Sequence, residues 1–139
     1  MLRSFVVGGM MAVLLVSPST EVQAAPVEQV VAQAPLKPTG KYRVSGDALL
    51  VRRDDGSMLV RLQNLDMDDG PALRVHLVPG RDKTSPQGGA DLGPLKGTRG
   101  THDYPVPAGA AVDLKGGTTV LVYCHAFNVA FGNATLSSA

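Results

Sequence analysis

Apolar and polar side chains alternate in several short runs after residue 40. Residues 58–63 place Met58, Val60 and Leu62 at every second position, with Arg61 and Gln63 on the other face, and residues 73–77 repeat the pattern. A period of two is typical of a strand with one face in a core and the other in water. The pattern predicts a core that contains Val60, Leu62, Val75, Leu77, Val122, Phe127, Val129 and Phe131.

Turn residues separate these runs. Asp54-Asp55-Gly56 predicts a hairpin between two strands, and residues 80–100 combine Gly, Pro and charged residues as a long loop does. No segment keeps a 3.6-residue period over three turns. A chain of 139 residues has room for one domain. The sequence therefore predicts an all-β fold, a small antiparallel β-sandwich of immunoglobulin-like or barrel-like form.

The first residues have the pattern of a secretory signal peptide. Arg3 precedes an apolar run over residues 5–16, and Val22-Gln23-Ala24 suits a signal peptidase, which predicts a signal peptide over residues 1–24. The run is shorter than the roughly 20 residues that cross a bilayer, so a retained N-terminal anchor is the weaker alternative. The protein is expected to be exported, periplasmic or secreted, without membrane contact beyond the removed signal peptide.

The next segment is rich in Ala, Val, Gln and Pro. Pro26, Pro35 and Pro38 lack a backbone donor and favour extended neighbours. We expect a flexible linker over residues 25–39, followed by one β domain over residues 40–139.

Charge excludes one class of partner. The chain has 13 Lys and Arg against 12 Asp and Glu, a net charge of +1, and the two signs are interspersed. Because nucleic-acid binding requires a basic patch or stripe, no nucleic-acid partner is expected.

Four blocks of sequence resemble a known family. They are Val44-Ser45-Gly46; residues 62–77, from Leu62-Gln63-Asn64-Leu65 to Leu73-Arg74-Val75-His76-Leu77; residues 91–107, which begin Asp91-Leu92-Gly93-Pro94; and residues 120–136, which contain Tyr123-Cys124-His125. In order and spacing they resemble the DM thirteen domain, a secreted β domain found alone in bacteria and beside DOMON domains in animals. Tyr123 stands where the family often has Trp, and Leu65 where it favours Phe.

The resemblance implies a redox or electron-transfer role through the single cysteine. That role falls on Cys124, either as a free thiol or as a ligand to a prosthetic group such as haem. The redox partner or extracellular ligand is unknown. Cys124 shares a strand face with Val120 and Val122, so the alternative is a non-catalytic binding or structural β domain with Cys124 buried in the core. A third reading is a small-ligand carrier with an apolar pocket between the sheets.

The other polar motifs give weaker evidence for a functional site. A blue-copper site needs two His and a Cys, but His125 follows Cys124 directly and points to the opposite strand face. No metal ligand is assigned, and each His is expected to face solvent. Asp66, Asp68 and Asp69 fail the calcium-loop spacing. The loop around Lys96 lacks a phosphate-binding pattern. Asn133-Ala134-Thr135 is either a glycosylation sequon or part of a strand.

Overall fold

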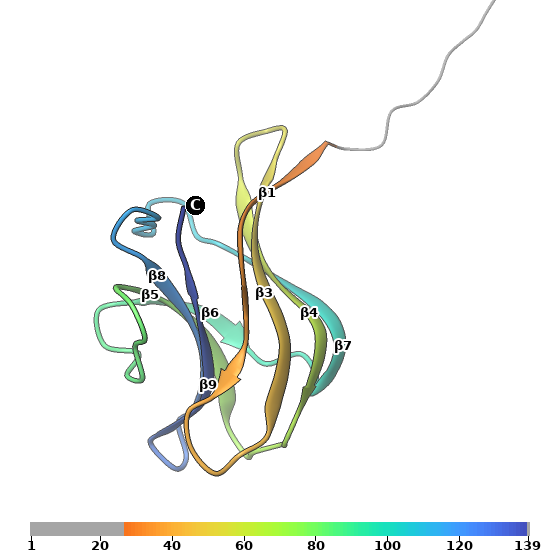
Figure 1. Cartoon of the computed structure of the whole chain (residues 1–139), viewed down its shortest axis with the longest axis vertical. Helices are drawn as coiled ribbons and strands as arrows, with labels where there is room; N and C mark the ends of the chain where they lie inside the picture. Colours follow the sequence, from red (N-terminus) through yellow and green to blue (C-terminus); the bar gives the residue numbers. More distant parts are fainter. Residues whose placement is uncertain (1–26, 139) are drawn as a thin grey trace, which may run out of the picture.

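The computed structural model describes residues 27–138, and within them every regular element is a β-strand (Figure 1). The predicted signal peptide, residues 1–24, lies outside the described residues. The strands are β1 (Glu28–Pro35), β2 (Lys37–Pro38), β3 (Val44–Arg53), β4 (Met58–Met67), β5 (Leu73–Pro79), β6 (Ala90–Pro94), β7 (Arg99–Pro105), β8 (Thr118–Cys124) and β9 (Val129–Leu136). In the described part of the chain there is no helix long and apolar enough to cross a membrane.

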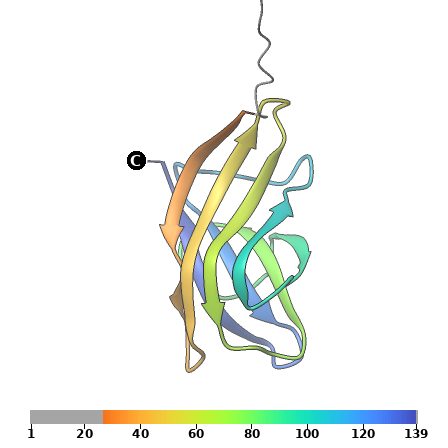
Figure 2. The ribbon, with the colours of Figure 1, turned by 90° about the vertical axis from the view of Figure 1, so that its right-hand side faces the viewer.

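The strands form two antiparallel sheets that pack face to face. One sheet has the order β1-β3-β4-β7 and the other the order β2-β9-β8-β5-β6. Figure 1 shows the two layers edge-on, and Figure 2 shows the four-stranded sheet from its outer face. The prediction of an all-β antiparallel sandwich is confirmed.

Two pairs of consecutive strands connect the sheets at their edges. β1 runs along β3 from Glu28 opposite Arg53 to Pro35 opposite Asp47. After the buried Leu36 the chain changes sheets, and β2 pairs with β9. On the other edge β6 belongs to the five-stranded sheet and β7 to the four-stranded one. The sandwich is therefore closed by its own chain on both sides.

The prediction of a flexible linker over residues 25–39 is wrong where the structure describes it. Residues Glu28–Pro38 contribute one strand to each sheet, and Ala32 and Leu36 are buried. Proline is tolerated here because β1 is an edge strand and Pro35 ends it, where a missing N–H costs no ladder bond.

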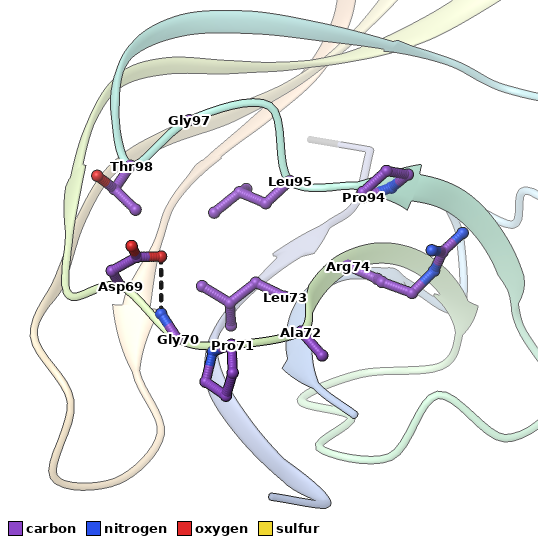
Figure 3. A pocket seen from close by; sticks show the side chains of 10 residues that line it. All are labelled: Asp69, Gly70, Pro71, Ala72, Leu73, Arg74, Pro94, Leu95, Gly97 and Thr98. Carbon is purple, nitrogen blue, oxygen red and sulfur yellow. Dashed lines mark hydrogen bonds between the residues drawn. The ribbon is translucent and has the colours of Figure 1, made fainter. Parts of the chain in front are cut away.

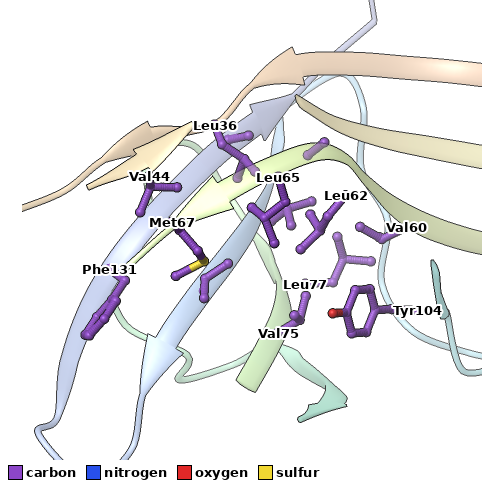
Figure 4. Close-up of a cluster of buried hydrophobic side chains, with 14 of the residues drawn as sticks. Leu36, Val44, Val60, Leu62, Leu65, Met67, Val75, Leu77, Tyr104 and Phe131 are labelled. Atoms are coloured by element: carbon purple, nitrogen blue, oxygen red, sulfur yellow. The ribbon is translucent and has the colours of Figure 1, made fainter. Parts of the chain in front are cut away.

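The core lies between the two sheets and confirms most of the predicted positions. Val60, Leu62, Val75, Leu77, Val122 and Phe131 are all buried, together with Leu36, Val44, Leu65, Met67 and Tyr104 (Figure 4). At one end the ring of Phe131 stacks on Tyr42 with 3.8 Å between ring centroids. Alternation within β4 and β5 was sufficient to assign Val60, Leu62, Val75 and Leu77 to the inner face.

The end of β8 differs from the prediction. The strand alternation does not continue through residues 125–128, which form a turn, and Phe127 at this turn is 53% exposed. Phe127 is therefore not a core residue, contrary to the prediction. Val129 is only partly buried, although it packs against the core.

Gly46, in the first of the sequence blocks, is required by a β-bulge. The register of β3 against β4 shifts between Ser45 and Asp47, and Gly46 has a φ of 121°. A Cβ atom at this position would lie 2.9 Å from the carbonyl oxygens of Gln63 and Asn64. Both the backbone angle and the close approach exclude other residues without strain.

Candidate functional site

Cys124 is the last residue of β8 and its side chain is 0% exposed. It lies on the inner face with Val120 and Val122, opposite Leu73 on β5 and Val129 on β9. The expected strand face is confirmed, and the thiol is enclosed by apolar side chains. No second thiol is present, because Cys124 is the chain's single cysteine.

A pocket of about 440 Å³ opens at the same end of the sandwich. It is lined by residues from the turn before β5 and the start of β5, and by residues from the end of β6 and the β6–β7 connection: Asp69, Gly70, Pro71, Ala72, Leu73, Arg74, Pro94, Leu95, Gly97 and Thr98. We call it the turn pocket. Figure 3 shows the Leu73 and Leu95 side chains lying next to each other, both directed toward the side of Asp69 and Thr98. The Leu95 N–H donates to the Leu73 carbonyl at 2.9 Å, which holds the two segments together.

Leu73 is shared between the turn pocket and the surroundings of Cys124. It lines the pocket, is 7% exposed, and is the direct cross-strand neighbour of Cys124. Side chains at directly opposed positions lie on the same face and touch. The next residue along the chain, His125, donates its N–H to the Ala72 carbonyl at 3.0 Å, which fixes the end of β8 to the pocket wall. Leu73 therefore belongs both to the pocket wall and to the immediate surroundings of the thiol.

The opposite face of the five-stranded sheet carries a polar cluster. His76 on β5 and His125 after β8 approach with 2.8 Å between their Nε2 atoms. The Tyr123 ring packs edge-on against both imidazoles, with centroids 6.4 Å from His76 and 5.1 Å from His125. We call these three residues the histidine cluster.

His76 was expected to face solvent, and that prediction is wrong, since it is 4% exposed. It does point to the outer face, but Tyr123 and His125 lie over it and β6 runs alongside. Burial lowers the pKa of His76, with Asp91 opposing and His125 and Arg74 adding to the shift.

Asp91 lies opposite His76 on β6 and is held by two donors. Arg74 Nε donates to one carboxylate oxygen at 2.8 Å, and the Gly93 N–H donates to the other at 2.8 Å. Burial acts to raise the pKa of Asp91, but these hydrogen bonds and the charge of Arg74 outweigh it and lower the pKa. Asp91 is a fixed negative charge beside the histidine cluster.

The remaining sequence candidates are structural. His102 bonds the Arg99 carbonyl at 2.7 Å on the other sheet. Asp66 and Asp68 form ion pairs with Arg43 rather than a cation loop. The amide of Asn133 is buried and donates to the Lys83 carbonyl at 2.9 Å, so the sequon is part of a strand.

The loop around Lys96 is anchored by Tyr104, which the sequence did not single out. The Lys96 N–H donates to the buried Tyr104 hydroxyl at 2.9 Å. Burial raises the pKa of Tyr104, and this hydrogen bond opposes the shift. The loop is therefore structural, as its sequence indicates.

Comparison with known proteins gives one match. A family model described as electron transfer DM13 matches residues 38–136. The chain belongs to this family. No curated protein and no solved structure matches it. The resemblance seen in the sequence is confirmed, and the family's description supports a general redox role for this DM13 domain.

The residues of this DM13 domain do not fit a haem held by Cys124. The thiol is enclosed by packed apolar side chains, and the turn pocket is lined by no His, Cys, Met or Tyr that would serve as an axial ligand. A ligand role would require the inner face of β8 to unpack. No step is therefore assigned to a prosthetic group.

Proposed function

We propose that this protein is an exported redox domain of the DM13 family in which Cys124 acts as a free thiol. Three observations support the proposal. The family is described as electron transfer, Cys124 is the only cysteine, and Leu73, which lines the turn pocket, lies directly opposite it on β5. The last of these carries the proposal, because it gives a buried thiol a short route to solvent.

The chemistry that suits such a thiol uses a small oxidant. With a hydroperoxide, the Cys124 sulfur attacks one peroxide oxygen, an S–O bond forms and the O–O bond breaks. Sulfur loses two electrons, and the other peroxide oxygen leaves, after taking up the thiol proton, as an alcohol or, from hydrogen peroxide, as water. The product is a sulfenic acid. One thiol reductant then forms a mixed disulfide with loss of water, and a second thiol releases Cys124 in its reduced form.

The test is to treat the folded protein with hydrogen peroxide and trap any sulfenic acid with dimedone. We expect one dimedone adduct, located at Cys124 by peptide mass spectrometry, and none in Cys124→Ala. Because dimedone does not react with oxidised methionine, the five Met residues do not contribute. An adduct that forms only after unfolding in urea would exclude a redox role for the native thiol.

The complete burial of Cys124 favours a second candidate, a binding or structural domain in which the thiol is part of the core. In that case Cys124→Ala loses only packing, about 1–2 kcal/mol of unfolding free energy, the low end for deletion of a buried side chain. Any partner-dependent electron transfer would then be unchanged by the substitution.

Export is the other part of the proposal, and it rests on the signal-peptide pattern of residues 1–24. N-terminal sequencing of the exported protein is expected to begin at Ala25. Recovery of a chain that begins at Met1 would contradict it.

A further inference from the structure

We propose that His76 and His125 form a binding site for one divalent transition-metal ion, with Cu²⁺ held most tightly. The two imidazoles come from β5 and from the turn after β8, 49 residues apart, and are brought to 2.8 Å between their Nε2 atoms. Imidazole nitrogen is a preferred ligand of copper and zinc, and affinities rise along the first-row series to Cu²⁺. This inference does not depend on the role of Cys124.

The distance between the nitrogens suits one ion. Two ligands in adjacent positions of a square-planar ion, each about 2.0 Å from it, lie about 2.8 Å apart. The two His nitrogens are separated by that distance already. An ion can therefore be bound without a change in the spacing of β5 and β8.

The direction of the rings must change on binding. The ring centroids are 5.1 Å apart, little more than the nitrogen separation plus the two ring radii, so the nitrogens now point directly at each other. That is the geometry of a shared proton. His76 is buried and held against Tyr123, whereas His125 is exposed on the β8–β9 turn. His125 is thus the ring that swings so that both lone pairs converge on the ion.

Binding of an ion changes which ring nitrogens carry hydrogen. In the neutral pair one Nε2 carries a hydrogen, and the ion requires both Nε2 lone pairs, so this ring takes the tautomer with hydrogen on Nδ1. No net proton is released. A singly protonated pair releases one proton to solvent, and binding weakens as pH falls.

The surroundings favour a cation. Asp91 lies opposite His76 on the neighbouring strand β6 and places a fixed negative charge there, and the positive charge of Arg74 partly offsets it. Both Asp91 oxygens accept hydrogen bonds, so Asp91 acts through its charge and not as a ligand. Within residues 27–138 no three His, Cys, Asp or Glu side chains are grouped to hold an ion, so water completes the coordination.

The test is a Cu²⁺ titration of the mature protein in a glycine buffer that suppresses weak binding, followed by calorimetry and electron paramagnetic resonance. We expect one ion per chain and a spectrum with coupling to two nitrogens. His125→Gln is expected to lower the affinity at least about 10-fold, since loss even of an outer-shell partner costs that much. Zn²⁺ is expected to bind at the same site more weakly.

His102→Gln is the matched control, because His102 lies on the other sheet and bonds only a backbone carbonyl. It should bind Cu²⁺ as the wild type does. Cys124→Ala should also bind Cu²⁺ normally, and this result would show that the metal site does not depend on the thiol. Circular dichroism confirms that each variant is folded. Equal binding by His125→Gln and the wild type, or no binding by the wild type in glycine, would overturn the proposal.

Discussion

Replacement of Leu73 by Ala tests whether Cys124 is reached through the turn pocket. Removal of a buried Leu side chain costs about 2–5 kcal/mol of unfolding free energy, depending on how well the gap is filled. Leu73 lines an open pocket that water can enter, so we expect about 2–3 kcal/mol. Leu77 lies on the same face of β5 but is enclosed in the core, so Leu77→Ala is expected to cost about 4 kcal/mol.

The two variants separate local from global opening. If Cys124 is exposed only by global unfolding, its labelling rate follows the unfolding equilibrium, in which about 1.4 kcal/mol is a factor of 10. Leu73→Ala would then label about 30- to 150-fold faster than the wild type, and Leu77→Ala faster still. If the thiol is reached by local opening at Leu73, Leu77→Ala changes the rate little, because local opening leaves the Leu77 contacts intact.

The assay is alkylation of the native protein, followed by mass spectrometry, with urea unfolding to measure stability. We expect Leu73→Ala to label faster than Leu77→Ala although it is the more stable of the two. Rates that rank in the order of global stability would refute the route past Leu73.

Three further changes test the framework that holds the site. Gly46→Ala should lower the free energy of unfolding by more than the about 1–3 kcal/mol that a positive φ alone costs, because the new Cβ atom also meets backbone oxygens. Gly88 has a positive φ but open space around it, so Gly88→Ala should cost only the backbone strain. Urea unfolding compares the two variants. The hydrogen bonds from Arg61 lower the pKa of Asp103. The ionised carboxylate therefore stabilises the folded protein above the unfolded pKa near 4, and this stabilisation is lost as pH falls through the lower folded pKa. Asp103→Asn should have a lower free energy of unfolding at pH 7 and should lose less of it as the pH falls. Tyr104→Phe leaves a loop N–H without its acceptor and should cost about 1–3 kcal/mol by thermal unfolding.

The strands of the core could be predicted because each has its own local pattern of apolar residues. The alternation of Leu73, Val75 and Leu77 is local, and only one face of a sandwich strand is apolar. β1 has no regular alternation of apolar and polar residues and ends in Pro35, and its strand conformation is imposed by pairing with β3. A stretch stabilised by a distant partner looks like a linker in the sequence.

The candidate site also combines a feature that the local sequence predicts with features that depend on distant segments. The inward direction of Cys124 follows from Val120 and Val122 on its own strand. Its neighbour Leu73 and the turn pocket depend on how β5 and the β6–β7 connection meet, and no sequence spacing encodes that. The His76–His125 pair joins residues from separate blocks, and His76 is buried by side chains of another strand.

The pairing of β2 with β9 also bears on when the domain can fold. Lys37 lies opposite Asn133, so nearly the whole domain forms a loop between these paired residues. Closure of so long a loop is slow, because its entropy cost precedes the contacts that stabilise it. A chain that emerges in sequence from a ribosome or a membrane pore cannot complete the sandwich until β9 has appeared. The domain therefore stays open until β9 has emerged and can pair with β2.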